Sequence, residues 1–322
     1  MPEAFVMAGE NRLWATASGV RIEVREWVPV IPVAEQGHPV LCVPGALSPA
    51  ESFRGLGLAM ASGDLGGRPR RCLAVSLRGR GSSEAPPSGY ALRDLVADIH
   101  AAAAVAGLAA DRAGHIGLGQ SMGVPQAVRY ALDVFGGYPA GGCLKGLALG
   151  DSPARCRRVP GEQSAAWRRV PPSFADWDEA FAWDQREFGV TREVFDRPKY
   201  RATYYRRLPG GRVGFNFSPA AALRVQEESA DIDFRADLGQ LACPVLVLRA
   251  SRGTQLPDEW VDLYRTGLPD GEVVTVDSDH SVFESEEGRL RLGEFLVRCD
   301  AAAASSGHRI AAADSGGDSP ER

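Results

Sequence analysis

The chain has 322 residues, of which 44% are hydrophobic and 24% charged, as in ordinary globular proteins. Its formal net charge of −5 gives no reason to expect a nucleic-acid partner. No stretch reaches the roughly 18 consecutive apolar residues of a transmembrane helix, so we expect no membrane span.

Short apolar runs alternate with amphipathic stretches along most of the chain. The apolar runs predict strands at residues 12–18, 20–27, 39–43, 72–77, 115–118, 144–149, 244–248 and 272–276. The stretches between them predict helices at residues 91–107, 257–266 and 286–298, and another from after residue 123 to about 134. The strand at 20–27 alternates apolar and polar residues, which predicts a half-exposed edge strand.

This order of elements is typical of an α/β fold. Continuously apolar strands that are each followed by a helix predict a mostly parallel central sheet with helices on both faces. In such sheets the ligand site lies at the carboxyl ends of the strands. We therefore look for functional residues just after each predicted strand.

Residues 154–235 interrupt the alternation of strands and helices. This segment is rich in arginine and aromatic residues, and we interpret it as a helical cap or lid. It divides the core into a first part, 1–153, and a second part, 236–300. The last residues, 301–322, are small, polar and aperiodic, which predicts a disordered tail.

The beginning of the chain, MPEAFVMAGENRLW, lacks a basic segment followed by an apolar run, so it does not resemble a signal peptide. The cysteines show no C-x-x-C spacing, and several lie in or beside predicted strands. We interpret them as buried, reduced thiols of a cytoplasmic protein. The six are Cys42, Cys72, Cys143, Cys156, Cys243 and Cys299.

The segment from Gly119 to Gly123, GQSMG, carries the strongest chemical signal. It has the pattern G-x-S-x-G between a predicted strand and a predicted helix, where a sharp turn exposes the serine and needs glycine on either side. The backbone N–H of Met122, at the start of the helix, then faces developing negative charge. The pattern predicts Ser121 as a nucleophile, and a glycine-rich structural turn is the alternative.

Several segments around this motif resemble the α/β-hydrolase superfamily, over about residues 12–298. PVLCVPGALSPAESF resembles its strand and oxyanion loop, and LAVSLRGRGSSEAPPSGYALRDLVADI is similar to its "RGxGxS" loop and following helix. VDSDHSVFESEEGRLRLGEFL resembles the loop of the catalytic histidine and the last helix. The resemblance implies a lidded α/β-hydrolase fold with Ser121 as nucleophile and His280 as base.

The histidines taken by themselves also favour His280. A serine hydroxyl needs an adjacent base to act as a nucleophile at neutral pH. Of the five histidines, only His280 follows the carboxyl end of a predicted strand, and the order serine then histidine is the one expected for this fold. A histidine on a surface loop is the alternative interpretation. The other four are His38, His100, His115 and His308.

The acid of the triad departs from the pattern of the family. The resemblance places it in the loop after PVLVL, where the corresponding residue is Thr254. Some members carry the acid after the preceding strand instead, and this chain has Asp151 there, in LALGDSP. Asp151 is our first candidate, although aspartate at this position can also be structural. The alternatives are Asp258 and a serine–histidine dyad without an acid.

The oxyanion loop departs from the family as well. Many members have His-Gly there, whereas this chain has Pro44-Gly45-Ala46 and so lacks the histidine that braces the loop. The resemblance implies the backbone N–H of Ala46 as the second oxyanion donor, beside that of Met122. A backbone donor needs no particular side chain, so the hole can survive the change.

The lid is positively charged within an acidic chain. Residues 154–212 contain twelve arginines and one lysine against eight acidic residues. One interpretation is an anionic or carrier-linked substrate, and the favoured alternative is a solvated helical face whose aromatics pack on the core. The clusters comprise Arg155, Arg157, Arg158, Arg168, Arg169, Arg201, Arg206 and Arg207, interleaved with Trp167, Trp177, Trp183, Tyr204 and Tyr205.

These observations lead to one preferred hypothesis and two rivals. The first is a serine hydrolase acting on an ester, thioester or similar acyl bond of a small molecule, with no cofactor and no metal, since neither HExxH nor a phosphate-binding GxxxxGK[ST] occurs. The second is a non-hydrolytic enzyme on the same scaffold, a lyase, cyclase, acyl transferase or cofactor-independent oxygenase that uses His280 and Asp151. The third is a ligand-binding protein without turnover.

Overall fold

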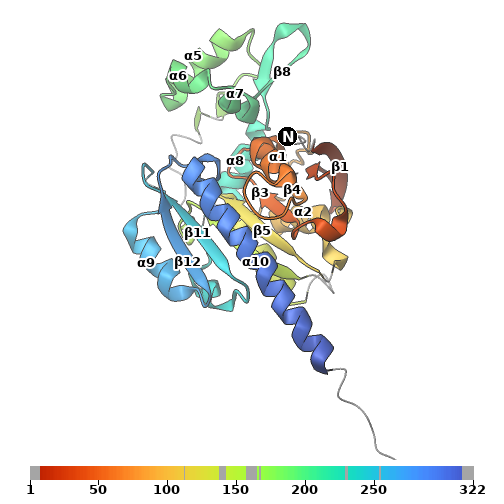
Figure 1. Ribbon diagram of the computed structural model, residues 1–322. Helices are drawn as coiled ribbons and strands as arrows, with labels where there is room; N and C mark the ends of the chain where they lie inside the picture. The colour runs from red at the N-terminus through yellow and green to blue at the C-terminus, as the bar shows by residue number, and fades with distance from the viewer. Residues whose placement is uncertain are drawn as a thin grey trace, which may run out of the picture.

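A central eight-stranded sheet organises the molecule (Figure 1). The computed structural model describes residues 8–111, 113–137, 143–156, 165–166, 168–228, 231–253 and 255–313. The strand order is β1-β2-β4-β3-β5-β6-β11-β12. Their bounds are β1 Gly9–Ala17, β2 Val20–Val28, β3 Val40–Val43, β4 Cys72–Ser76, β5 His115–Gln120, β6 Leu144–Gly150, β11 Val245–Ala250 and β12 Gly271–Val276.

The sheet is parallel from β4 to β12, and the first two strands run antiparallel to their neighbours. The mostly parallel sheet predicted from the sequence is therefore confirmed. The prediction that the second strand lies at the edge is wrong, because β2 pairs with β1 on one side and β4 on the other. Its alternating glutamates are buried beside cations, Glu23 with Arg12 and Glu26 with Arg71, so polarity there does not mean exposure.

Helices cover both faces of the sheet and bury two separate apolar clusters. On one face α1 (Arg54–Ser62) and α10 (Glu286–Ala313) pack against one set of alternate strand residues. On the other face α2 (Leu92–Val105), α3 (Gly123–Phe135) and α9 (Asp258–Gly267) pack against the opposite set. The alternation of side chains along each strand produces this division.

Helix α1 is absent from the sequence-based prediction for a physical reason. It contains Gly55 and Gly57, and glycine is a poor helix former. Gly57 is needed for packing, since a Cβ there would lie 2.2 Å from Cε3 of the buried Trp27. Gly57 therefore both weakens the helical pattern in the sequence and allows the helix to pack closely against the sheet.

Helix α10 corrects the predicted tail. A disordered segment was expected from residue 301, but the helix continues to Ala313 and extends beyond the core (Figure 1). The reason is composition, because Ala301 to Ala304 have the highest helix propensity of any residue type and simply prolong the preceding turns. Residues 314–322 lie outside the described part of the chain.

The middle of the segment predicted as a lid, from α5 to β9, forms a separate layer beyond the carboxyl ends of the strands, whereas α8 and the residues beside β7 and β10 pack against the core (Figure 1). Phe174, Trp183 and Phe215 are among the buried aromatic residues that give it a core of its own. The short strands β7 and β10 pair antiparallel where the segment leaves and rejoins the core. Its elements are β7 Arg155–Cys156, α5 Trp177–Phe188, α6 Arg192–Phe195, α7 Pro198–Tyr204, β8 Tyr205–Arg207, β9 Val213–Phe215, α8 Pro219–Glu228 and β10 Ile232–Asp233.

Within the described residues, no helix has the length and apolar character needed to cross a membrane. The five cysteines whose side chains are described are free thiols. Two of them, Cys42 and Cys72, lie side by side on β3 and β4, with their sulfur atoms 3.8 Å apart.

His115, at the start of β5, is expected to make stability depend on pH. Burial lowers its pKa to about 4, whereas the unfolded chain has the ordinary value of about 6.5. The unfolded state therefore binds more protons between these values, and stability falls as the pH drops from about 6.5 towards 4. Both the wild type and His115→Gln are expected to lose free energy of unfolding when the pH falls from 7.5 to 4.5. We expect the loss to be about 2–3 kcal/mol larger in the wild type.

Urea titrations of both proteins at the two pH values measure this difference. His38 and His100, whose pKa values burial also lowers, remain in both proteins and so cancel in the comparison. An equal loss of stability in the two proteins would contradict the assignment to His115.

Candidate active site

Ser121 lies in a strained turn between β5 and α3. Its φ is 53°, in the left-handed region that side chains rarely adopt, and its N–H donates to the carbonyl of Gly150 at 2.8 Å. The turn leaves no room for side chains at the flanking glycines. A Cβ on Gly119 would lie 2.8 Å from the Gly123 carbonyl oxygen, and one on Gly123 would lie 2.3 Å from that of Val43. The G-x-S-x-G spacing is thus a steric requirement of this turn.

Gly123→Ala is expected to destabilise the fold by about 1–3 kcal/mol, because the new methyl group meets two backbone carbonyls that cannot move independently. Gly55→Ala in α1 is a matched control, since the nearest atom to its Cβ would be 3.5 Å away. That variant should gain about 0.5–1 kcal/mol from the better helix former. Urea denaturation measures both, and a Gly123→Ala protein as stable as the wild type would contradict the steric argument.

Asp151 follows the neighbouring strand at the same level of the sheet. Gln120 on β5 pairs with Gly150 on β6, so Ser121 and Asp151 each come one residue past a paired position. The Asp151 side chain is 1% exposed and its φ is 44°. Its Oδ1 accepts a hydrogen bond from the N–H of Ala250 at 3.1 Å, which ties the carboxylate to β11.

His280 meets Asp151 across the end of the sheet. Its Nδ1 lies 2.7 Å from Oδ2 of Asp151, and its side chain remains 42% exposed. The backbone carbonyl of His280 accepts a hydrogen bond from Nε2 of Gln120 at 2.7 Å, which anchors the loop after β12 to β5. The histidine is therefore held from two sides with the other face of its ring available.

The alternative acids do not reach His280. Asp258 is 88% exposed and pairs with Arg249 at 2.5 Å, at the start of α9. Thr254, which the resemblance placed at the usual acid position, lies outside the described residues. Among the described carboxylates, Asp151 is the one within hydrogen-bond distance of the imidazole.

A cavity of about 880 Å³ brings the candidate residues together. Ser121 and His280 line its floor from the core, Ala46 lines it from the predicted oxyanion loop, and residues of α6 and α7 close it from the lid. Met122 immediately precedes helix α3 as its N-cap, where the first N–H groups have no partner within the helix. The arrangement gathers a nucleophile, a base and a backbone donor around one space.

The sequence from residue 40 to residue 291 matches a family described as Alpha/beta hydrolase family. The chain belongs to this family. A search of curated proteins finds no match.

Solved structures share the fold of this α/β hydrolase over about nine tenths of its length. An alpha/beta hydrolase from Novosphingobium aromaticivorans has a TM-score of 0.67 at 23% identity, over 91% of this chain and 99% of that one. E-2-(acetamidomethylene)succinate hydrolase has a TM-score of 0.66 at 21% identity, over 90% and 100%. A thermophilic esterase from Thermogutta terrifontis has a TM-score of 0.66 at 19% identity, over 90% and 99%.

Most of the lid arginines singled out from the sequence lie at the surface of this α/β hydrolase. Acidic neighbours pair with three of them, in the pairs Arg168–Glu227, Arg169–Glu187 and Arg201–Asp196. Arg206 and Arg207 are exposed on β8. Trp177, Trp183 and Tyr205 belong to the lid's own aromatic core, and Arg157, Arg158 and Trp167 lie outside the described residues.

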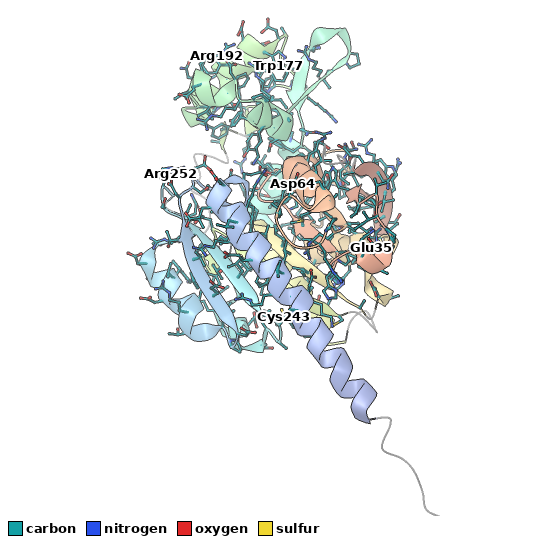
Figure 2. All side chains as sticks on the ribbon, in the orientation of Figure 1. Glu35, Asp64, Trp177, Arg192, Cys243 and Arg252 are labelled. Carbon is teal, nitrogen blue, oxygen red and sulfur yellow. The ribbon has the colours of Figure 1, made fainter. Side chains whose placement is uncertain are left out.

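Three cations do reach the cavity. Arg197 and Lys199 approach from the lid, and Arg252 lies on the side of the core that faces the lid (Figure 2). Two acidic residues, Asp279 and Glu284, line the same space. Lys199 and Glu284 form an ion pair of 3.2 Å that joins the lid to the core.

Gln120 is a site residue that sequence reasoning missed. It occupies a variable position of G-x-S-x-G, so the motif carries no signal for it. Its role as a donor to the carbonyl of His280, 160 residues further along the chain, emerges only from the pairing of the strands.

Proposed function

We propose that this α/β hydrolase cleaves an ester, thioester or similar acyl bond of a small molecule through an acyl-enzyme on Ser121. The observation that carries the proposal is the contact of 2.7 Å between His280 Nδ1 and the buried Asp151, beside a serine in a strained turn. A buried carboxylate next to an imidazole fixes the tautomer and stabilises the imidazolium that forms when the histidine accepts a proton.

The chemistry follows from these positions. With its Nδ1 proton donated to Asp151, His280 presents Nε2 as the basic nitrogen. It takes the hydroxyl proton as Ser121 attacks the acyl carbon, and the N–H groups of Ala46 and Met122 stabilise the oxyanion. His280 then protonates the leaving group, and a water molecule that it activates releases the acid and regenerates the serine. The cycle needs no cofactor.

The cavity supports a small-molecule substrate. Its volume of about 880 Å³ falls within the usual range of ligand pockets, roughly 300–1,000 Å³. Its lining mixes hydroxyl-bearing residues with three cations and two acidic residues, which favours a polar group near the acyl bond. The hydrolase and esterase among the structural neighbours support the reaction class, and the acyl group is left to experiment.

A fluorophosphonate probe, followed by peptide mass spectrometry, tests the acyl-enzyme proposal directly. We expect one phosphonyl adduct, on Ser121, and turnover of at least one member of a panel of p-nitrophenyl esters and acyl-CoA thioesters. A folded wild-type protein that is neither labelled nor active on the panel would contradict the proposal and favour non-hydrolytic chemistry by the His280–Asp151 pair.

A further inference from the structure

Arg80 is a buried cation without a carboxylate partner. It follows β4 in the loop beneath the lid, and only 2% of it is exposed. The nearby Asp98 is engaged by Arg78 at 2.7 Å, and among the described residues no carboxylate forms an ion pair with Arg80. Burial lowers the pKa of Arg80 to about 10, so the group stays charged near neutral pH. An unpaired buried charge is costly to a fold and calls for a functional reason.

The side chain of Arg80 has one hydrogen-bond acceptor among the described residues, and it is a backbone carbonyl. Its Nη1 donates to the oxygen of Gly45 at 3.2 Å. Its Nη2 is buried and has no partner in the described part of the chain. The guanidinium is therefore directed at the predicted oxyanion loop.

The carbonyl of Gly45 and the N–H of Ala46 belong to the same peptide group. In a trans peptide these two groups point in opposite directions, so a donor that holds the oxygen also sets the direction of the N–H. The peptide lies close to the nucleophile, because a Cβ on Gly45 would be 3.1 Å from Cβ and 3.7 Å from Oγ of Ser121. Arg80 thus binds the carbonyl end of the peptide group that lies beside Ser121.

One backbone hydrogen bond within the loop shares this oxygen with Arg80. The Gly45 oxygen also accepts a hydrogen bond from the N–H of Ser48 at 3.3 Å. Neither Pro44 nor Gly45 has a polar side chain, so Arg80 is the side-chain donor to this oxygen among the described residues. Leu47 has a φ of 61°, so the backbone there is strained and depends on outside contacts to stay in place. The charge-assisted bond from Arg80 is such a contact.

We propose that Arg80 is a positioning residue, whose guanidinium fixes the Gly45–Ala46 peptide so that the N–H of Ala46 is presented to the oxyanion. This inference rests on the proposed acyl-enzyme chemistry at Ser121. The positive charge also polarises the peptide, which strengthens its N–H as a donor.

Kinetics of Arg80→Met, Arg80→Lys and a control test the proposal. For the best p-nitrophenyl ester we expect Arg80→Met to lower kcat by about 10- to 100-fold with KM changed less than about threefold, since a misaligned oxyanion donor acts on the transition state. Arg80→Lys retains the charge and should recover most of the loss. Arg70→Met is the control. It removes another buried arginine, which lies just before β4 and pairs with Asp300, and its kcat should stay within about threefold of the wild type.

A crystal structure of Arg80→Met gives a readout independent of activity. The proposal expects the Gly45–Ala46 peptide to turn or lose its order in this variant. A Gly45–Ala46 peptide that stays in place in Arg80→Met overturns the positioning role. An unchanged kcat in Arg80→Met, or an equal loss of kcat in Arg70→Met, overturns it as well. If the wild-type protein proves inert and unlabelled while the peptide turns in Arg80→Met, the proposed function fails and the positioning role stands.

Discussion

Ser121→Ala is expected to lower kcat by about 10⁴-fold or more, because it removes the atom that forms the acyl-enzyme. Alanine can occupy the same strained turn and leaves the cavity intact, so KM should change little and the thermal midpoint should move by no more than a few degrees. Steady-state kinetics on the best substrate of the panel, with a thermal melt of both proteins, measure the effect.

Labelling by the fluorophosphonate probe should disappear in the same variant. Activity of Ser121→Ala within tenfold of the wild type would contradict the role of this serine, because general base catalysis of direct water attack by His280 cannot reproduce covalent catalysis at that level.

Asp151→Asn is expected to lower kcat by about 10²- to 10⁴-fold through the tautomer of His280. One carboxylate oxygen of Asp151 accepts from the N–H of Ala250, and the other faces Nδ1 of His280. In the variant, the amide oxygen is retained by the N–H of Ala250, which leaves the NH₂ group facing the imidazole. Nδ1 must then accept, the ring proton moves to Nε2, and the histidine can no longer take the proton of Ser121.

Asp258→Asn is the matched control, since it alters the other candidate acid, which is exposed and paired with Arg249. We expect its kcat to remain within about twofold of the wild type. Equal losses in the two variants, or an active Asp151→Asn and an inactive Asp258→Asn, would remove Asp151 from the proposed triad.

The sheet could be predicted from the sequence because its strands are short apolar runs that end at turn residues. Segments such as PVLCV and PVLVL need burial on both faces, and a parallel sheet between helices provides it. The failures have local causes. Gly55 and Gly57 hide α1 from sequence-based prediction, and the buried glutamates of β2, which pair with Arg12 and Arg71, hide its interior position. The alanines after residue 300 lie in a segment whose composition resembles a polar tail, yet they favour a helix.

The individual candidates of the site could be named from sequence, but their contacts could not. Ser121 and His280 stand at motif positions, and Asp151 stands after a predicted strand. The contacts of Gln120 with His280 and of Arg80 with Gly45 join segments with no local pattern in common. They follow from strand order and loop packing, which periodicity does not encode.

The lid and the core divide their tasks sharply. Ser121, Asp151, His280 and the strands that hold them belong to the core, whereas the lid leaves and rejoins it at the two-residue strands β7 and β10. Mutational drift in Val194, Arg197, Tyr200 and Thr203, which line the cavity from the lid, can change which molecule fits without disturbing the acid–base pair. The lid is therefore the module on which selection, or a directed-evolution library, can act to redirect specificity on an unchanged reactive centre.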